Sequence, residues 1–231
     1  MVKDGYKQKV IDTILSIQDE ISPVIELDLN SPNIFAFDLT ENNSELRKVD
    51  LLNTKAFEKY IFDQMKIKNT SVAIGKYNEN RTIYKRSNLF ENDMTNRTVH
   101  LGIDLWAKSG TGVFAPMFGK VHSFKYNNNF GDFGPTIILQ HSINNVVFYT
   151  LYGHLSLSSI KGLKIGKLFE AGEKIAEIGN YPINGNWPPH LHFQLITDML
   201  GKQGDFYGVA SIKECKKYLD LCPDPNLILN I

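Results

Sequence analysis

Residues 188–193 read PPHLHF, and this stretch decides the fold of the second half of the chain. Two consecutive prolines exclude a helix that continues from upstream. On a β-strand, His190 and His192 project to one face, whereas Leu191 and Phe193 project to the other face, into a core. The pattern therefore predicts a strand with histidines on one side and a buried apolar surface on the opposite side.

A second histidine begins residues 100–104, which read HLGID. The central glycine and β-branched isoleucine argue against a helix. Positions i and i+4 share a face on a strand, so the imidazole of His100 and the carboxylate of Asp104 are expected to point into the same space. On a third expected strand, Tyr152 and His154 also share a face.

Two imidazoles and one carboxylate make a catalytic zinc set, because they leave the fourth tetrahedral position of the ion for water. The ion lowers the pKa of that water towards about 7 and polarises a scissile carbonyl. Two further histidines nearby would orient the water, move its proton and donate to the oxyanion. A lone His-x-His motif is usually packing, but all three segments together, in this order on β structure, are a strong signal.

From residue 100 onward, short β-type runs alternate with glycine-rich breaks, and no helical pattern lies between them. This texture predicts an antiparallel all-β core rather than a parallel sheet with crossover helices. The expected strands are 113–115, 120–126, 136–141, 146–154, 173–178 and 190–196.

The flanking regions predict helices and a hairpin. An apolar stripe predicts a helix over 7–21, and Thr54 is expected to cap a second helix. Strands at 71–77 and 81–86 are expected to form a hairpin, and a final helix is expected at about 212–221. The region before residue 96 carries no chemical motif that identifies a role.

The motifs resemble those of the lysostaphin-type, LytM-like zinc metallopeptidases, which are peptidoglycan endopeptidases. That family shows H-x-x-x-D, then Y-x-H-L, then H-L-H-F, and the same patterns stand here at 100–104, 152–155 and 190–193. The resemblance covers about residues 97–197. Its glycine-rich frame also matches, at 102–105, 110–116, 119–121 and 172–179.

The resemblance implies one Zn²⁺ per chain, with His100, Asp104 and His192 as its ligands. His154 and His190 would then be the catalytic pair outside the ligand set. It also implies a mainly β fold, an antiparallel β-sandwich with a substrate groove along one sheet. The expected organisation is a mixed α+β region at 1–95, the metallopeptidase-like β domain at 96–200, and a C-terminal helix and tail at 201–231 that pack on it.

Three features depart from the family pattern and bear on the substrate. Residues 184–189 read NGNWPP where the family usually has small residues and a glycine, Gln194 stands where an acidic residue is common, and the loop 127–133 is bulky. These changes are expected to lie in the groove walls. They leave the expected metal ligands intact.

Other side chains are candidates for binding or for structure. Arg97 is a candidate for a substrate carboxylate, Trp187 for a groove wall, and Tyr152 for donation to an oxyanion, each against a purely structural role. His141 is expected to make a structural hydrogen bond, and His122 is expected at the surface.

Composition restricts the partners. Lys and Arg total 25 and Asp and Glu total 25, so the chain lacks the basic stripe of a nucleic-acid binder and the polybasic patch of a membrane binder. No apolar run reaches the roughly 18 residues of a membrane span. No signal peptide is visible, so a cytoplasmic location is expected, or an exported one if a leader was removed. Cys215 and Cys222 are expected to be unpaired structural thiols.

The expected function is therefore zinc-dependent hydrolysis of a peptide or peptidoglycan-type amide bond. Alternatives are a non-catalytic member that binds a partner through the same groove, or an intracellular hydrolase module with another substrate, associated with other enzyme domains. A phosphocarrier with paired histidines is a third, against which Asp104 argues because phosphate transfer needs no such carboxylate. The region 1–95 would either cover the groove or extend the fold.

Overall fold

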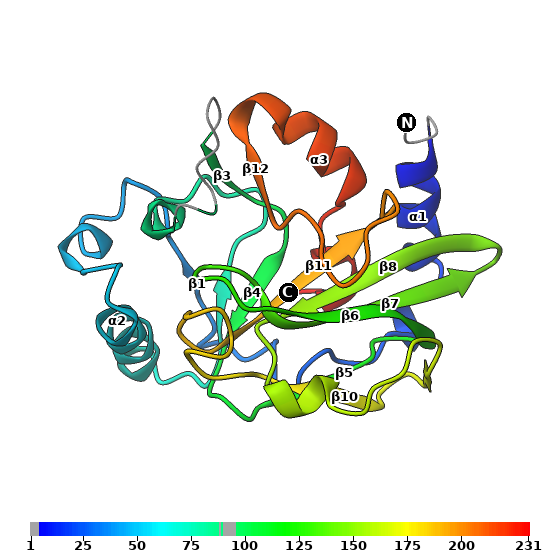
Figure 1. The fold of residues 1–231 in the computed structure, drawn as a ribbon, viewed down its shortest axis with the longest axis horizontal. Coiled ribbons are helices and arrows are strands. Elements are labelled where there is room, and N and C mark those ends of the chain that lie inside the picture. Colours follow the sequence, from blue (N-terminus) through cyan, green and yellow to red (C-terminus); the bar gives the residue numbers. More distant parts are fainter. Residues whose placement is uncertain (1–4, 88, 90–95) are drawn as a thin grey trace.

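The computed structural model describes residues 5–87, 89 and 96–231. Its main feature is an eight-stranded sheet with the order β1-β2-β4-β11-β8-β7-β6-β9 (Figure 1). Every neighbouring pair is antiparallel except β1 and β2, so the predicted antiparallel, mainly β fold is confirmed. The strands are β1 (Ala36–Phe37), β2 (Ala73–Gly75), β4 (Ile103–Trp106), β11 (His190–Ile196), β8 (Val146–Gly153), β7 (Gly134–Ile143), β6 (Gly119–Asn127) and β9 (Leu168–Phe169).

In the described part of the chain, two small antiparallel pairs and four α-helices surround this sheet. In Figure 1, β5 and β10 lie below it, α2 at the left, α1 at the right and α3 at the top. The pairs are β5 (Gly112–Phe114) with β10 (Lys174–Glu177), and β3 (Arg97–His100) with β12 (Val209–Ser211). The helices are α1 (Tyr6–Leu15), α2 (Thr54–Ile67), α3 (Cys215–Leu221) and α4 (Asn226–Leu229).

Alternation along β11 separates the core from the site. Leu191, Phe193 and Leu195 belong to the largest buried cluster, which also holds side chains of α1, β5 and β10. The opposite face of β11 carries the two histidines. On that side lie two further apolar clusters, one around α2 and β1, and one that includes α3 and Ile196. The histidine face of β11 therefore lies between these two clusters.

The region before residue 96 extends the main sheet. β2 pairs with β4, and Gly75 is the register partner of Asp104. The expected strand at 81–86 is wrong, because Ile83–Arg86 is a 3₁₀ helix. An isolated bridge from Asn80 to Val99 joins this stretch to β3.

The helix boundaries differ slightly from expectation. Thr54 is not the cap of α2, because the side chain of Asn53 accepts hydrogen bonds from the first free backbone N–H groups. The hydroxyl of Thr54 instead donates to the carbonyl of Asn186 at 2.9 Å. Cys215 and Cys222 are unpaired, as predicted. Within the described residues, no helix combines the length and apolar character that a membrane span requires.

Candidate metal centre

Neighbouring strands bring the expected ligands to one point. His192 on β11 and Asp104 on β4 are direct cross-strand partners, and His100 ends β3, just before the turn into β4. A Cβ at Gly102, in that turn, would lie 2.6 Å from Cε1 of His192, so only glycine leaves room for the ring. Each of the three ligand candidates is 3% exposed or less.

Three donor atoms form a nearly equilateral triangle. Nε2 of His100 lies 2.9 Å from Nδ1 of His192 and 3.2 Å from Oδ1 of Asp104, and the last two atoms are 3.1 Å apart. A tetrahedral zinc ion with bonds of about 2.0 Å holds its ligand atoms roughly 3.3 Å apart. The spacing and chemistry of this donor set therefore fit a single zinc ion with one position left free.

In each ligand imidazole, the outer nitrogen, which faces away from the donor triangle, makes a hydrogen bond to an oxygen. Nδ1 of His100 donates to the carbonyl of Lys76 at 2.9 Å, and Nε2 of His192 donates to Oε1 of Gln194 at 2.9 Å. Because both acceptors are oxygens, these contacts assign the N–H to the outer nitrogen in each ring. Two lone pairs and a carboxylate oxygen thus converge at about 3 Å, an arrangement that a cation stabilises.

The two remaining motif histidines adjoin this triangle. His154 and His190 donate from Nδ1 to the carbonyls of Asn184 at 2.8 Å and Pro188 at 2.7 Å, which leaves Nε2 of each ring as an acceptor. Their ring centroids are 4.2 Å apart, and Nε2 of His190 lies 3.8 Å from Oδ1 of Asp104. Trp106 stacks on His190 with a centroid distance of 4.2 Å and holds its ring plane.

Burial sets the charge of this group. Burial lowers the pKa of His100 to about 3 and that of His190 to about 4, and it lowers the pKa of His154 as well. The pKa of Asp104 is held well below its usual value: burial opposes this, and His100 and Arg81 outweigh it. At neutral pH the imidazole of His100 is neutral and the carboxylate of Asp104 is ionised, which are the states that bind a metal. His154 and His190 are neutral as well, which is the state that accepts a proton.

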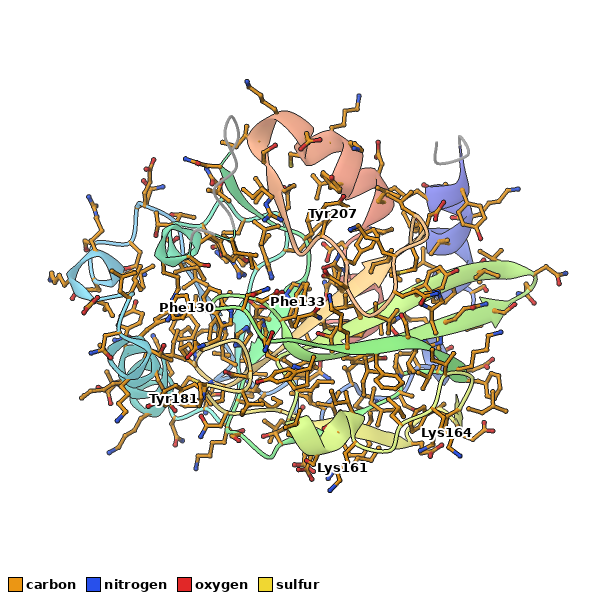
Figure 2. All side chains as sticks on the ribbon, in the orientation of Figure 1. Phe130, Phe133, Lys161, Lys164, Tyr181 and Tyr207 are labelled. Carbon is orange, nitrogen blue, oxygen red and sulfur yellow. The ribbon has the colours of Figure 1, made fainter. Side chains whose placement is uncertain are left out.

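A cavity of about 260 Å³ opens onto the site. It is lined by Trp187 and by all five motif side chains, His100, Asp104, His154, His190 and His192. Phe133 covers part of it, with its ring centroid 5.0 Å from that of His192. Tyr207 lines another part, and Figure 2 shows Phe133 near the middle of the molecule with Tyr207 above it. Arg97 also lines the cavity and donates to the carbonyl of Leu89.

Tyr152 does not join the site, contrary to expectation. Its ring lies in the main core, fully buried, and its hydroxyl group hydrogen bonds to the Thr150 hydroxyl at 2.9 Å. The reason is the backbone of His154, which follows the end of β8 with a φ of 62°. This left-handed conformation breaks the alternation of the strand, so the two side chains do not share a face.

The other histidines have the expected structural roles. His141 is buried and contacts the carbonyl of Phe118 and the hydroxyl of Thr150 at 2.8 Å each. His122 is partly exposed and contacts Ser123. Sequence reasoning missed Arg81, whose guanidinium contacts Asp104 at 2.5 Å. No motif marks this arginine.

A buried His₂Asp triangle beside two neutral histidines, opening into a cavity, defines a candidate site of the metallohydrolase class. Residues 98–204 match the model of peptidase family M23. This stretch is therefore similar to peptidase family M23, and the resemblance to LytM-like peptidases that the motifs predicted is confirmed. No curated protein sequence matches the chain.

Several solved structures are similar to parts of the chain. A zinc-containing peptidase from Vibrio cholerae is 29% identical over 46% of this chain and 29% of its own, with a TM-score of 0.33. The catalytic domain of the antimicrobial peptidase lysostaphin from Staphylococcus simulans is 23% identical over 62% and 86%, with a TM-score of 0.41. The M23 protein EnpA from Enterococcus faecalis is 22% identical over 51% and 95%, with a TM-score of 0.36. The match therefore spans less than a third of the Vibrio cholerae chain.

Proposed function

We propose that this protein is a zinc-dependent metallopeptidase that hydrolyses an amide bond in a peptide or a peptidoglycan-type substrate. The observation that carries the proposal is the donor triangle of His100, Asp104 and His192, with edges of 2.9 to 3.2 Å. The family M23 match supports the peptidase class. The description of lysostaphin as an antimicrobial peptidase supports a peptide-like substrate.

In this proposal, His100, Asp104 and His192 hold one Zn²⁺. When bound, the ion would supply Lewis acidity that activates a water molecule and polarises the scissile carbonyl. Hydrogen bonds from the outer imidazole nitrogens to Lys76 and Gln194 keep both rings in the metal-binding tautomer.

The two other motif histidines would handle protons. Nε2 of His154 and Nε2 of His190 are free acceptors, because Nδ1 of each ring donates to a backbone carbonyl. Either nitrogen would take a proton from the attacking water, and the resulting imidazolium would donate it to the developing oxyanion or to the leaving amine. Stacking on Trp106 holds His190 in place for this transfer.

The walls of the cavity would bind the substrate. Trp187 is buried beside both proton-transfer histidines, with ring centroids 6.1 Å from His154 and 6.3 Å from His190. Arg97 lines the same cavity and would contribute positive charge. A purely groove-binding role is less favoured, because all five motif side chains are present and mutually oriented. A cytoplasmic location and an association with other enzyme domains stay predictions, which cell fractionation and co-purification test.

Metal content of the full chain tests the proposal. We expect about one zinc per chain, measured by inductively coupled plasma mass spectrometry on protein purified without chelator, and little zinc in His192→Ala. His122→Ala removes a histidine outside the site and should keep the metal. Mass spectrometry of products from a peptide library and from purified peptidoglycan would then identify the bond. Absence of zinc in the wild type, or equal zinc in His192→Ala, contradicts the proposal.

A further inference from the structure

We propose that Arg81 is a positioning residue of the metal centre, which restricts Asp104 to binding the ion through one oxygen. This inference rests on the proposed function. It assigns a role to the segment 75–81, which lies before the part of the chain that matches the peptidase family.

The guanidinium of Arg81 is fixed on every side. Nη1 donates to Oδ2 of Asp104 at 2.5 Å, Nη2 donates to the carbonyl of Lys76 at 3.0 Å, and Nε donates to Oε2 of Glu79 at 2.9 Å. Nη1 also contacts the hydroxyl of Tyr84 at 3.3 Å. The arginine is 1% exposed, so its position is set by these protein contacts.

The two oxygens of Asp104 have different partners. Oδ1 faces the two ligand imidazoles, at 3.1 and 3.2 Å, whereas Oδ2 accepts from Arg81. A carboxylate that is free to rotate can bind a metal through one oxygen or two. Because Arg81 occupies Oδ2, only Oδ1 would be available to a cation held by the two imidazoles.

The carbonyl of Lys76 links Arg81 to a second ligand. It accepts from Nη2 of Arg81 and also from Nδ1 of His100. The same segment is paired with β3 through backbone hydrogen bonds from His100 to Glu79 at 3.0 Å and from Arg81 to Thr98 at 2.8 Å. Two of the three proposed ligands are therefore oriented by residues that precede the family match.

Gly75 makes the approach of Arg81 possible. A Cβ at this position would lie 2.8 Å from Nη2 of Arg81 and 3.0 Å from Oδ2 of Asp104. Any larger residue would occupy the space between the guanidinium and the carboxylate. The glycine therefore belongs to the same arrangement, although it contacts no metal ligand through a side chain of its own.

The charges around Arg81 still allow a cation to bind. An unpaired arginine next to the ligands would oppose a dication, but Glu79 pairs with the far side of Arg81. The group of Glu79, Arg81 and Asp104 carries a net charge of −1. Arg81 therefore orients the carboxylate while the local charge still favours a cation.

The test compares zinc affinity in the full chain, measured by competition with a fluorescent chelator. Removal of a partner that orients a metal ligand costs about 10- to 100-fold in affinity, so we expect such a loss in Arg81→Met and a smaller one in Arg81→Lys. Glu79→Gln keeps the size of that side chain and should also weaken binding, because it removes the compensating negative charge. Arg86→Met is the matched control, since Arg86 is another buried arginine and contacts none of the proposed ligands.

Replacement of zinc by Co²⁺ gives a second measurement. A substitution that only lowered the stability of the protein would leave the absorption spectrum of the bound Co²⁺ unchanged. The visible absorption of Co²⁺-loaded protein reports coordination number, so we expect a changed spectrum in Arg81→Met, an intermediate one in Arg81→Lys, and the wild-type spectrum in Arg86→Met. If Arg81→Met does not fold, Arg81→Lys and Glu79→Gln decide the matter.

The outcomes separate this inference from the proposed function. Wild-type protein that binds no zinc overturns the proposed function. Wild-type protein that binds zinc, together with Arg81 variants of equal or higher affinity and unchanged cobalt spectra, overturns only the positioning role. Higher affinity in those variants would identify Arg81 as a competitor of the metal.

Discussion

Oε1 of Gln194 accepts a hydrogen bond from Nε2 of His192 at 2.9 Å, on the side of the imidazole that faces away from Asp104. The amide nitrogen of Gln194 donates in turn to the carbonyl of Tyr207 at 3.0 Å and to Sγ of Cys222 at 3.2 Å. A neutral amide thus fixes the tautomer of a proposed metal ligand. The expected place of Gln194 in a groove wall is wrong, because its side chain is fully buried behind His192.

Replacement of this amide should weaken metal binding. Gln194→Leu keeps the volume but removes the acceptor, so the imidazole of His192 can rotate and zinc affinity should fall about 10- to 100-fold. Thr197→Val removes another buried hydrogen bond, to Leu221 at 3.0 Å, just after the same strand. That control should leave the affinity unchanged, and an equal loss in both variants would show a general loss of stability instead.

Replacement of the proton-transfer histidines should separate chemistry from metal binding. In His154→Gln and His190→Gln we expect hydrolysis to fall by about 10²- to 10⁴-fold, because the proton acceptor is lost. Zinc content should stay near the wild-type value, since neither ring belongs to the donor triangle. Parallel measurement of zinc and of product formation checks this, and loss of the metal in both variants would argue against the assigned roles.

The stability of the metal-free protein should depend on pH. Burial lowers the pKa of His100 to about 3, and those of His190 and His141 to about 4, whereas in the unfolded chain each is near 6.5. Below pH 6.5 the unfolded state therefore binds more protons. The free energy of unfolding should fall as the pH drops from about 6.5 towards 4, by on the order of 1 kcal/mol per pH unit for each histidine.

Urea unfolding with chelator present, at pH 7, 6 and 5, measures this dependence. His141→Gln removes one of these histidines at a place remote from the proposed ligands, so its pH dependence should be smaller than that of the wild type. Equal stability at pH 5 and pH 7 would contradict the prediction.

Substitutions at Phe133 and Gly208 should have coupled effects on the free energy of unfolding. A Cβ at Gly208 would lie 2.4 Å from Cζ of Phe133, so Gly208→Ala should push the ring and destabilise the protein by about 1–3 kcal/mol. In a Phe133→Leu background the same change should cost much less, because the aromatic ring is gone. Thermal unfolding of both single variants and the double variant gives the coupling, and equal costs in both backgrounds would disprove it.

Much of the fold followed from local pattern. The expected strand at 190–196 coincides with β11, and those at 120–126 and 136–141 lie within β6 and β7. Alternation of apolar and polar residues specifies a strand with one buried face, and glycines mark its ends. These signals are local, so the sequence alone expresses them.

Features that depend on distant chain segments were not predictable. Arg81 reaches the site because β2 joins the sheet beside β4. Neither the extension of the sheet by β1 and β2 nor the space at Gly75 has a sequence signature. Tyr152 was misplaced because a left-handed residue, His154, interrupts the strand period. The donor triangle was expected because the motifs resemble those of the LytM-like family, and in the structure strand register and the turn at Gly102 bring its members together.

The pairing of β2 with β4 has a practical consequence for a shortened protein that contains only residues 98–204, the part that matches the peptidase family. Without β2, the backbone N–H and C=O groups along one side of β4 would have no partner, and this strand carries Asp104. Such an open edge is a template for strand addition from other molecules. A shortened protein would therefore tend to self-associate through the very strand that bears its carboxylate ligand.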